Sequence, residues 1–273
     1  MKLVARTRTA SAASALAASV FASCALAAGS APDDQLLFSG DGSTLTGDHG
    51  GGGGSAAWLR KFDSGSLIGL GAEYQTVFNS HWTLGNFNAA LGLGQGTLKS
   101  SLYAEAHLGA GDTAGEPFHY TNVAGGVLSA LTPWLTVQLE ERYIDIKPSR
   151  GNLPKLGLSA RLGQRLLASA SYAQSFGGNL GTKLGTARLD YAGARFSWLV
   201  GAAYGPVAPS VLNLIGQVLA PAPRLKEGFL GVGRSFGRTD WKLVGDYQDL
   251  EGFKRTTVTL NCTVHLGSPG PAP

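Results

Sequence analysis

The chain has 273 residues, of which 15% are charged and 40 are glycines, and its formal net charge is +4 at pH 7. About a quarter of the residues of a soluble domain are charged, so this composition is unusual for one. A bundle of membrane helices is excluded as well, because the mean hydropathy is only +0.05. The small positive charge gives no basis for nucleic-acid binding, which needs basic residues gathered on one face.

The first 27 residues have the pattern of a secretory signal peptide. Lys2, Arg6 and Arg8 precede an apolar, alanine-rich run, and Ala25-Leu26-Ala27 provides a cleavage site of small residues. We therefore expect export through the Sec route and removal of residues 1–27. The mature chain then loses three basic charges, so its net charge falls to about +1.

The two cysteines allow one alternative at this terminus. Phe21-Ala22-Ser23-Cys24 loosely resembles a bacterial lipobox, in which a lipid is attached to the cysteine. If residues 1–27 are removed instead, Cys262 is the only cysteine left and no disulfide can form within the chain.

Residues 28–54 are expected to form a flexible N-terminal segment. Residues 50–54 are five consecutive glycines, which is typical of a loop or linker because glycine adds no side chain to a core. Residues 35–45 are a candidate for a first strand within this segment.

Residues 55–267 alternate apolar and polar side chains with a period of two. This is typical of a sheet whose faces meet different surroundings. In residues 97–108, one face of the predicted strand carries Leu98, Leu102, Ala104, Ala106 and Leu108. The other face carries Lys99, Ser101, Tyr103, Glu105 and His107. Glu141 is an exception, because it places a charge on an apolar stripe.

The connectors between these segments alternate between very short and longer. The short ones are Gly94-Gln95-Gly96, Thr132-Pro133, Gly163-Gln164, Gly193-Ala194 and Arg238-Thr239. The longer ones are residues 111–117, 147–152, 178–183, 208–224 and 251–254. Short periplasmic turns and longer outside loops are the asymmetry of an outer-membrane β-barrel.

The fold class predicted is therefore all-β, an antiparallel up-and-down transmembrane barrel formed by residues 55–267 with the candidate strand before them. Strands are predicted to begin at Leu67, Trp82, Thr97, Phe118, Trp134, Leu153, Arg165, Leu184, Ala194, Leu225, Asp240 and Arg255, and two more precede them at residues 35–45 and 55–62. Single-chain bacterial barrels have even strand numbers, so the total is twelve or fourteen. We expect fourteen, because the short turn at residues 63–66 extends the rhythm of the connectors.

A soluble β-sandwich would alternate in the same way. Two features favour the membrane. Charged residues lie on the polar face, and aromatic residues recur near segment ends, as in interface girdles, at Trp82, Trp134, Phe176, Trp241 and Phe253.

Two later stretches depart from the strand pattern. Residues 208–220 place apolar side chains at helical spacing after Pro209, which predicts a short helix in an outside loop that folds over or into the barrel mouth. A spanning helix is the alternative. Residues 268–273 contain three prolines and are expected to be disordered.

The last third of the chain resembles the YaiO-type outer-membrane barrels. The resemblance rests on an aromatic strand (Phe196, Trp198, Tyr204), a long apolar loop, a glycine-rich strand at residues 228–233 and a final alternating strand. It implies a role near exopolysaccharide systems. Barrels of this kind usually end in an aromatic residue recognised by the barrel assembly machinery, whereas Leu266 occupies that place here.

No catalytic motif is present, and the five histidines lack metal-ligand spacing. We therefore expect no metal and no cofactor. The best case for an enzyme uses His107 and His119 beside one outside loop, with Glu105 or Ser101 nearby, as in a membrane lipase or lipid A deacylase. The alternative is that these are ordinary lumen or loop histidines.

Charged residues on the polar stripes are the candidate functional residues. Those predicted to line the lumen are Glu73, Glu105, Glu140, Arg142, Arg161, Arg165, Arg188, Asp190, Lys242 and Asp246. They form either a salt-bridged plug or the wall of a wet pore. The hypothesis is a non-enzymatic outer-membrane pore or an accessory to surface-glycan export, with lipid, lipopolysaccharide, and a polysaccharide or small solute as partners. A membrane lipid hydrolase and a structural or adhesive barrel are the alternatives.

Overall fold

The computed structural model describes residues 33–46, 49–77, 80–93, 99–212, 222–251 and 253–267. The predicted signal peptide, the lipobox cysteine Cys24, the short connector at residues 94–96 and the predicted disordered tail lie outside these ranges. The described strands are β1 (Asp33–Leu45), β2 (His49–Lys61), β3 (Leu67–Val77), β4 (Ser80–Leu93), β5 (Ser100–Thr113), β6 (Glu116–Ala130), β7 (Leu135–Ile146), β8 (Ser149–Asn152), β9 (Lys155–Leu162), β10 (Leu166–Gln174), β11 (Lys183–Ala192), β12 (Phe196–Pro206), β13 (Arg224–Phe236), β14 (Thr239–Leu250) and β15 (Phe253–His265).

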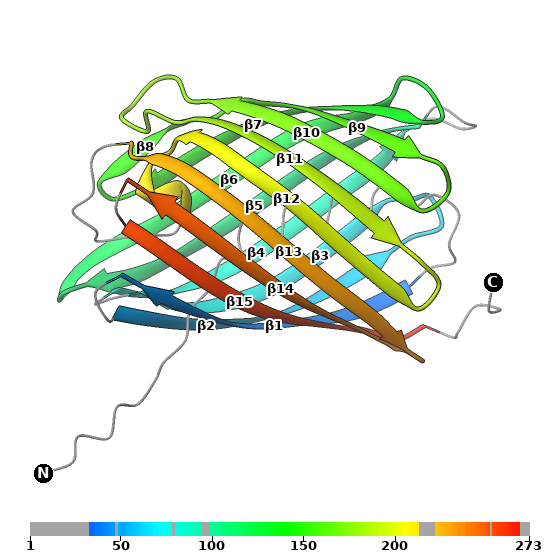
Figure 1. Cartoon of the computed structure of the whole chain (residues 1–273), viewed down its shortest axis with the longest axis horizontal. Helices are drawn as coiled ribbons and strands as arrows, with labels where there is room; N and C mark the ends of the chain where they lie inside the picture. The colour runs from blue at the N-terminus through cyan, green and yellow to red at the C-terminus, as the bar shows by residue number, and fades with distance from the viewer. Residues whose placement is uncertain are drawn as a thin grey trace, which may run out of the picture.

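These strands form one closed antiparallel barrel (Figure 1). Each strand pairs with its neighbours in the chain, and β1 pairs with β15 to close the sheet. β8 and β9 both pair with β7 and together form one strand of the wall. The wall therefore has 14 strands, and the predicted fold and strand number are confirmed.

The break between β8 and β9 falls at Leu153 and Pro154. Asn152 pairs with Tyr143 and Lys155 pairs with Glu140, so the register continues across the break. Proline has no backbone N–H and cannot donate to the ladder, which explains why the strand is interrupted there rather than ended.

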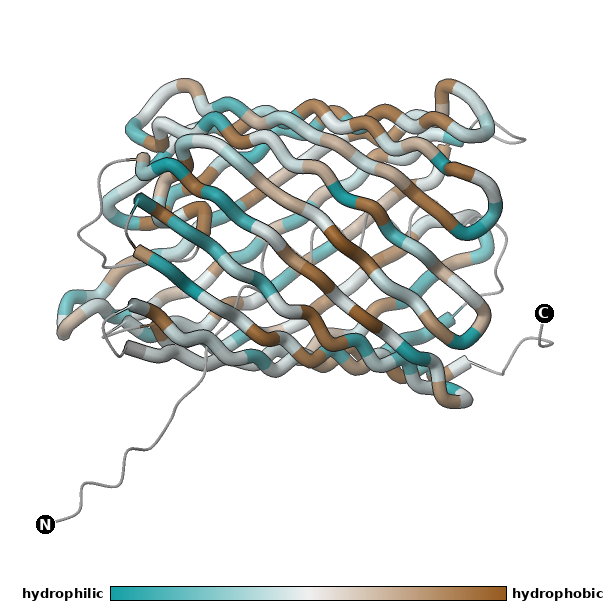
Figure 2. The backbone as a smooth tube through the Cα atoms, viewed as in Figure 1, coloured by the Kyte–Doolittle hydropathy of each residue, from teal (hydrophilic) through white to brown (hydrophobic). Residues whose placement is uncertain are grey.

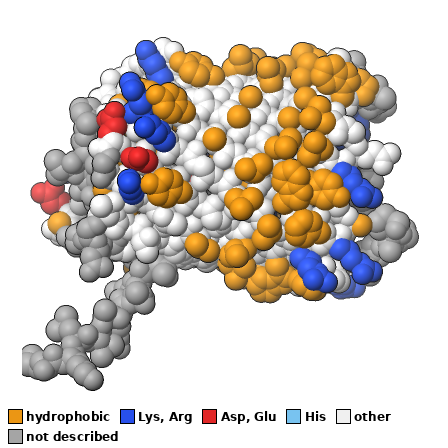
Figure 3. All heavy atoms as spheres, in the orientation of Figure 1, with side chains coloured by type: hydrophobic (Ala, Val, Ile, Leu, Met, Phe, Trp, Pro, Cys, Tyr) orange, Lys and Arg blue, Asp and Glu red, His pale blue; other side chains and the backbone are white. Residues whose placement is uncertain are grey.

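The predicted alternation is confirmed by the exposure of successive side chains. On β3, Leu70 and Tyr74 are 53% and 50% exposed, whereas Glu73 and Gln75 are 4% and 1% exposed. The outer surface is a band of apolar side chains between charged residues at both ends (Figures 2 and 3). Leu102, Leu158 and Leu230 belong to this band.

One end of the barrel carries only short connectors. They are residues 62–66, 131–134, 163–165, 193–195 and 237–238, together with 94–99, which the structure describes only at Lys99. Asp33 and His265, the outer ends of β1 and β15, lie at this end as well. The predicted gathering of tight turns at one end is therefore confirmed for the connectors that the structure describes.

The other end differs from the prediction. Residues 175–182 and 207–223 are long connectors there, as expected. The longer loops predicted at residues 111–117, 147–152 and 251–254 are wrong, because the strands continue almost to two-residue connectors. Ala114 and Gly115 have φ angles of 52° and 88°, the left-handed conformation that a tight hairpin of this type requires. The strands extend beyond the apolar band, and their polar residues there resemble loop residues in the sequence.

The glycine run also differs from the prediction. Residues 50–54 belong to β2, where all five pair with β1 and residues 51–54 also pair with β3, so they are not a linker, and the described wall begins at Asp33. A Cβ atom at Gly53 would lie 2.6 Å from Gln75 Oε1 and 2.7 Å from the Tyr74 carbonyl oxygen. The missing side chain leaves room for the buried Gln75. The candidate first strand at residues 35–45 is part of β1.

Two of the five aromatic residues assigned to the girdles point inward. Trp82 is 1% exposed and Phe253 packs against the apolar core. Trp134, Phe176 and Trp241 are exposed, as a girdle requires. Parity along each strand decides which face a residue occupies, and closeness to a strand end does not.

The helix predicted after Pro209 is present as a single 3-10 turn, η1 (Pro209–Leu212). The rest of the predicted helix, residues 213–220, lies outside the described ranges. Within those ranges, no helix has the length and apolar character needed to cross a membrane.

Replacing Gly109 by alanine is expected to destabilise the barrel. A Cβ atom there would lie 2.0 Å from the Thr83 carbonyl oxygen and 2.9 Å from the Leu84 Cα, so backbone has to move. We expect Gly109→Ala to cost about 1–3 kcal/mol, as overpacking does. Gly40→Ala is the matched control, because nothing lies within 4 Å of its Cβ position. The measurement is the urea midpoint of unfolding, followed by heat-modifiable gel migration. Equal midpoints for the two variants would contradict the prediction.

Candidate functional site

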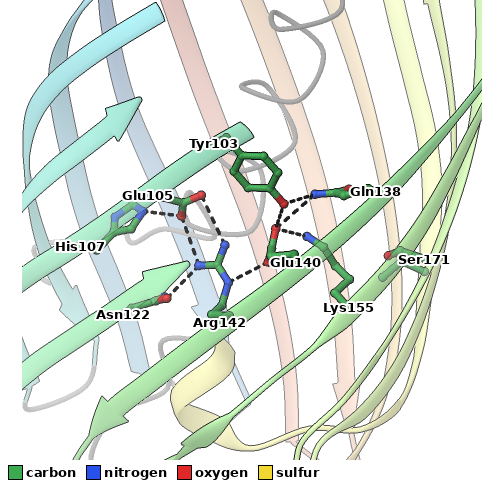
Figure 4. Close-up of polar contacts among 10 residues, drawn as sticks. Tyr103, Glu105, His107, Asn122, Gln138, Glu140, Arg142, Lys155 and Ser171 are labelled. Atoms are coloured by element: carbon green, nitrogen blue, oxygen red, sulfur yellow. Dashed lines mark hydrogen bonds and ion pairs between the residues drawn. The ribbon is translucent and has the colours of Figure 1, made fainter. Parts of the chain in front are cut away.

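Arg142 on β7 is the centre of a polar network inside the barrel (Figure 4). Its Nη1 and Nη2 donate to the two oxygens of Glu105 at 3.2 and 3.4 Å, and its Nε donates to Glu140 Oε1 at 3.1 Å. Nη1 also donates to Asn122 Oδ1 at 2.8 Å. One guanidinium group therefore joins β5, β6 and β7, using the fork geometry that suits carboxylates.

Glu140 extends the network toward β9. Its Oε2 accepts hydrogen bonds from the Tyr103 hydroxyl at 2.6 Å and from Gln138 Nε2 at 3.2 Å. Lys155 Nζ lies 2.8 Å from the same oxygen. Gln138 Nε2 also donates to the Tyr103 hydroxyl oxygen at 2.7 Å. Both carboxylates of the network, Glu105 and Glu140, are thus paired with cations and neutral donors.

Strand register brings these residues together. Glu140 and Arg142 are alternate residues of β7, as Glu105 and His107 are of β5, and alternate residues share a face. Charges taken out of water are stable only when they are paired and hydrogen-bonded, and this network satisfies both conditions for its carboxylates. It forms a rigid part of the lumen wall.

His107 continues the network on β5. Its Nε2 lies 2.7 Å from Glu105 Oε1, and its Nδ1 has no hydrogen-bond partner among the described residues. The Nδ1 atom of His107 therefore has hydrogen-bonding capacity beyond the network. Glu73 lies on β3, where it accepts a hydrogen bond from Gln75 Nε2 at 2.8 Å.

A second polar group lies on β13, β14 and β15. Arg255 is 2% exposed, and its Nη1 donates to the Leu212 carbonyl oxygen at 3.2 Å. Gln248 pairs with Arg255 in the sheet and donates to Glu227 Oε1 at 3.0 Å. Asp246 Oδ1 and Arg255 Nε have no hydrogen-bond partner within the described ranges. This group ties η1 to the barrel wall.

An apolar cluster lies at the end that carries the long connectors. It joins inward side chains of the wall to residues of the two long connectors, and its buried members are Leu45, Val77, Trp82, Leu84, Phe118, Tyr120, Ile144, Ile146, Leu153, Ala173, Leu180, Ala203, Val207, Ala208, Leu225 and Leu250. The Ala208 N–H donates to Thr182 Oγ1 at 3.0 Å, so the two connectors are bonded to each other. The predicted folding of the loop into the mouth is confirmed for residues 207–212. We call this cluster the apolar seal.

The predicted lumen residues occupy three places. Glu105, Glu140 and Arg142 form the network above, and Glu73 lies beside it on β3. Asp246 belongs to the Arg255 group. Arg188 and Asp190 form an ion pair on β11, and Lys242 lies on the inward face of β14.

Arg161 and Arg165 are not part of these groups. Both are exposed at the end with short turns, Arg161 near the end of β9 and Arg165 in the turn before β10. Neither is joined to the other eight in the described structure. Arg165 was taken as the first residue of a strand, but β10 begins one residue later.

Sequence reasoning missed several inward residues. Lys155, Glu227 and Arg255 stand at or near the starts of strands, where polarity also fits a loop. The parity of the following residues was the available signal. Thr257 and Thr259 are polar residues of the final alternating strand, and Arg255 shares their parity.

The two histidines of the hydrolase alternative do not meet. His107 is buried on the inward face of β5, whereas His119 is exposed on the outward face of β6. The wall lies between them, so one site cannot use both. In the described part of the chain, no group of three or more histidine, cysteine or acidic residues is placed to hold a metal ion.

Comparison with solved structures identifies the architecture. The chain is similar to CymD, a monoaromatic hydrocarbon channel, with a TM-score of 0.53 and 11% identity over 88% of this chain and 89% of CymD. A deltaS2S3 mutant of the monoaromatic hydrocarbon channel TodX has a TM-score of 0.53 and 9% identity over 87% of this chain and 91% of the mutant. Omp33, an outer-membrane protein of Acinetobacter baumannii, has a TM-score of 0.52 and 12% identity over 86% of this chain and 99% of Omp33.

At these identities the likeness establishes the fold alone, which is the closed antiparallel β-barrel of outer-membrane proteins. No family model and no curated protein matches the chain in sequence. The resemblance to YaiO-type barrels stays a prediction.

Removing the central cation of the network tests its role. Arg142→Met leaves two buried carboxylates without their shared partner, and breaking a buried pair in this way costs about 3–5 kcal/mol. We expect Glu105→Gln in the same background to recover part of the loss. Arg161→Met is the control, because an exposed substitution changes stability by about 0.5 kcal/mol or less. Urea unfolding followed by tryptophan fluorescence measures all three, and equal losses for Arg142 and Arg161 would refute the network.

Proposed function

We propose that the protein is a solute channel of the bacterial outer membrane, with a charged lumen and a seal at its outer mouth. The observation that carries the proposal is the reversal of polarity across the wall, which is apolar outside and charged inside. Barrels of eight strands are filled by their own side chains, whereas barrels of sixteen to eighteen strands leave an aqueous channel. A wall of 14 strands lies near the upper of these sizes, so its interior is too wide for wall side chains alone to fill.

The charge of the lumen favours cations. Among inward residues of the described strands that are not exposed, carboxylates outnumber basic side chains. The carboxylates are Asp33, Asp41, Glu73, Glu105, Glu140, Asp190, Glu227, Asp240 and Asp246, and the basic side chains are Lys61, Arg142, Lys155, Arg188, Lys242 and Arg255. Acidic linings select cations because they lower the electrostatic barrier to their entry.

The apolar seal sets the resting state of the channel. Its members come from the long connectors as well as from the wall, so the seal is removed when the connectors leave the mouth. Hydrophobic constrictions of this kind close pores by excluding water. The proposal therefore includes a closed state that opens by movement of residues 175–182 and 207–212.

Weakening the seal is expected to increase conduction. Ala208→Asp places a charge inside the buried cluster, and we expect the open probability in planar bilayers to rise several-fold. Ala114→Asp is the control, because it adds the same charge on an exposed hairpin at the same end. Arg255→Gln is the second variant. It removes the bond to Leu212 without adding charge to the seal. A folded protein that never conducts, in the wild type and in both seal variants, would overturn the channel.

Ion selectivity is a separate expectation. Under a KCl gradient, the reversal potential of the open channel should show a preference for potassium over chloride. The double variant Glu227→Gln and Asp246→Asn should reduce this preference, because it removes two inward carboxylates. Asp145→Asn, on the outward face of β7, should leave it unchanged. Anion preference in the wild type would contradict the assignment.

An accessory role in surface-glycan export is the second candidate function. It rests on the resemblance of the last third of the chain and on neutral amide side chains on the inward face, among them Gln75, Asn86, Asn88, Asn122 and Gln138. Amides both donate and accept hydrogen bonds, as sugar hydroxyls do. The test is a chromosomal deletion with measurement of surface and periplasmic glycan. Unchanged surface glycan would exclude this role.

A further inference from the structure

Four basic side chains stand on the outward face of the barrel at the end with the long connectors. They are Lys183 on β11, Arg224 and Lys226 on β13, and Lys254 on β15. All four are exposed. Figure 3 shows basic side chains at this end of the face formed by these strands, with acidic side chains among them, and a second group of basic side chains at the opposite end. Within the described part of the chain, none of the four side chains forms an ion pair or a hydrogen bond, although the Lys254 backbone bonds to Thr46 Oγ1.

The register places these cations in two rows. Lys226 pairs with Tyr204 on one side and with Asp249 on the other, and Asp249 pairs with Lys254. Lys226 and Lys254 are therefore two strands apart, about 10 Å. Arg224 lies in the row above Lys226. An anion between them would meet cations from neighbouring strands, with one carboxylate among them.

Their height on the wall matches a membrane boundary. Lys226 and Arg234 are separated by eight residues of β13, about 27 Å along the strand. At a tilt of about 40° this corresponds to roughly 20 Å along the membrane normal, close to the height of the apolar band of such barrels. Tyr204 and Tyr247 lie at the upper edge, and Trp241 lies at the lower edge beside Arg234. The four cations are thus at the level of lipid headgroups.

A shallow strip of small side chains lies directly below the cations. Ala187, Ala202 and Gly228 occupy one row on three adjacent strands, and Tyr247 bounds the row. Nothing lies within 4 Å of a Cβ atom built at Gly228. Packing therefore does not require glycine at residue 228. The missing side chain lowers the surface beside Tyr247.

The opposite arc of the same rim has a different charge. The outward face of β7 carries Glu141 and Asp145, and Arg150 on β8 lies opposite Asp145. Lys147 is paired with Glu116 at 3.4 Å. In the described rim, four basic side chains without an ion pair lie on the arc formed by β11 to β15, and Arg150 is the one such side chain on the opposite arc.

We propose that this arc binds a phosphorylated glycolipid of the outer leaflet. Arg224, Lys226 and Lys254 hold the phosphate, and an acyl chain lies along the strip at Gly228. Arginine forms paired hydrogen bonds with phosphate oxygens, and lysine contributes point charge. The inference rests on the proposed function in one respect, the orientation that puts the long connectors outside the cell.

The test uses the detergent-solubilised full-length protein and purified bisphosphorylated lipid A, with binding measured by native mass spectrometry and titration. The triple variant Arg224→Gln, Lys226→Gln and Lys254→Gln should weaken binding at least tenfold. The matched control is Arg195→Gln with Arg238→Gln, two exposed arginines at the opposite end, and it should bind as the wild type does. Heat-modifiable migration shows that each variant is folded.

Two further measurements separate the parts of the site. Dephosphorylated lipid A should bind the wild type no better than it binds the triple variant. Gly228→Leu should weaken binding of acylated lipid A but not of its deacylated headgroup. Equal binding by the triple variant, or equal loss in the control, would overturn the proposal. Inorganic phosphate that displaces the lipid at equimolar concentration would show a free-anion site and would overturn it too.

The outcome is distinguishable from failure of the channel. The cations lie outside the lumen, so the triple variant should conduct like the wild type. Lipid binding without any conductance would remove the channel and leave the lipid site standing.

Discussion

The sheet has to close, because hydrocarbon provides no hydrogen-bond partner for a free strand edge. β1 and β15 close it through a register that runs from Leu45 opposite Arg255 to Gln35 opposite His265. His265 then lies 2.7 Å from Asp33 on β1 and 2.8 Å from Asp240 on β14. One imidazole thus bonds to carboxylates on both neighbouring strands at the end of the seam. Since closure occupies the backbone groups of the wall, chemistry in the lumen depends on side chains alone.

The period of two was enough to predict the faces of the wall. Glu73, Glu105, Glu140 and Arg142 share parity with other polar residues of their strands, so their common face follows from the sequence. What the pattern does not contain is which inward residues meet. The bond between Arg142 and Glu105 spans 37 positions and depends on the register of three strands. Register is set by turns, and the lengths of several turns were predicted wrongly.

The wrong predictions share a physical cause. The place of each residue in the barrel depends on a partner strand that the local sequence does not reveal. The glycines at residues 50–54 look flexible alone, yet Gly53 is required by the Gln75 side chain of β3. Arg255 looks like an ordinary first residue of a strand, yet its guanidinium is buried and donates to the Leu212 carbonyl oxygen of a distant connector. Trp82 looks like an interface residue, yet its position in the alternation of β4 points its side chain inward, where it packs in the apolar seal. Each case requires a contact that is distant in sequence.

The seal and the network occupy different parts of the barrel, and this separation makes a moving gate compatible with a stable wall. The Arg142 network joins β5, β6, β7 and β9, whereas the connectors that complete the seal leave from β10 and β12. Withdrawing those connectors exposes apolar surface and breaks the bond to Leu212 and those of Phe176 and Asn179 to the wall, but it breaks no ion pair of the network. Elements that move in a protein are those with the lowest local stability. Here that stability comes from apolar burial, from the Arg255 bond to Leu212, and from hydrogen bonds of Phe176 and Asn179 to residues 148–152. None of these contacts involves the Arg142 network, so opening the mouth does not require that network to rearrange.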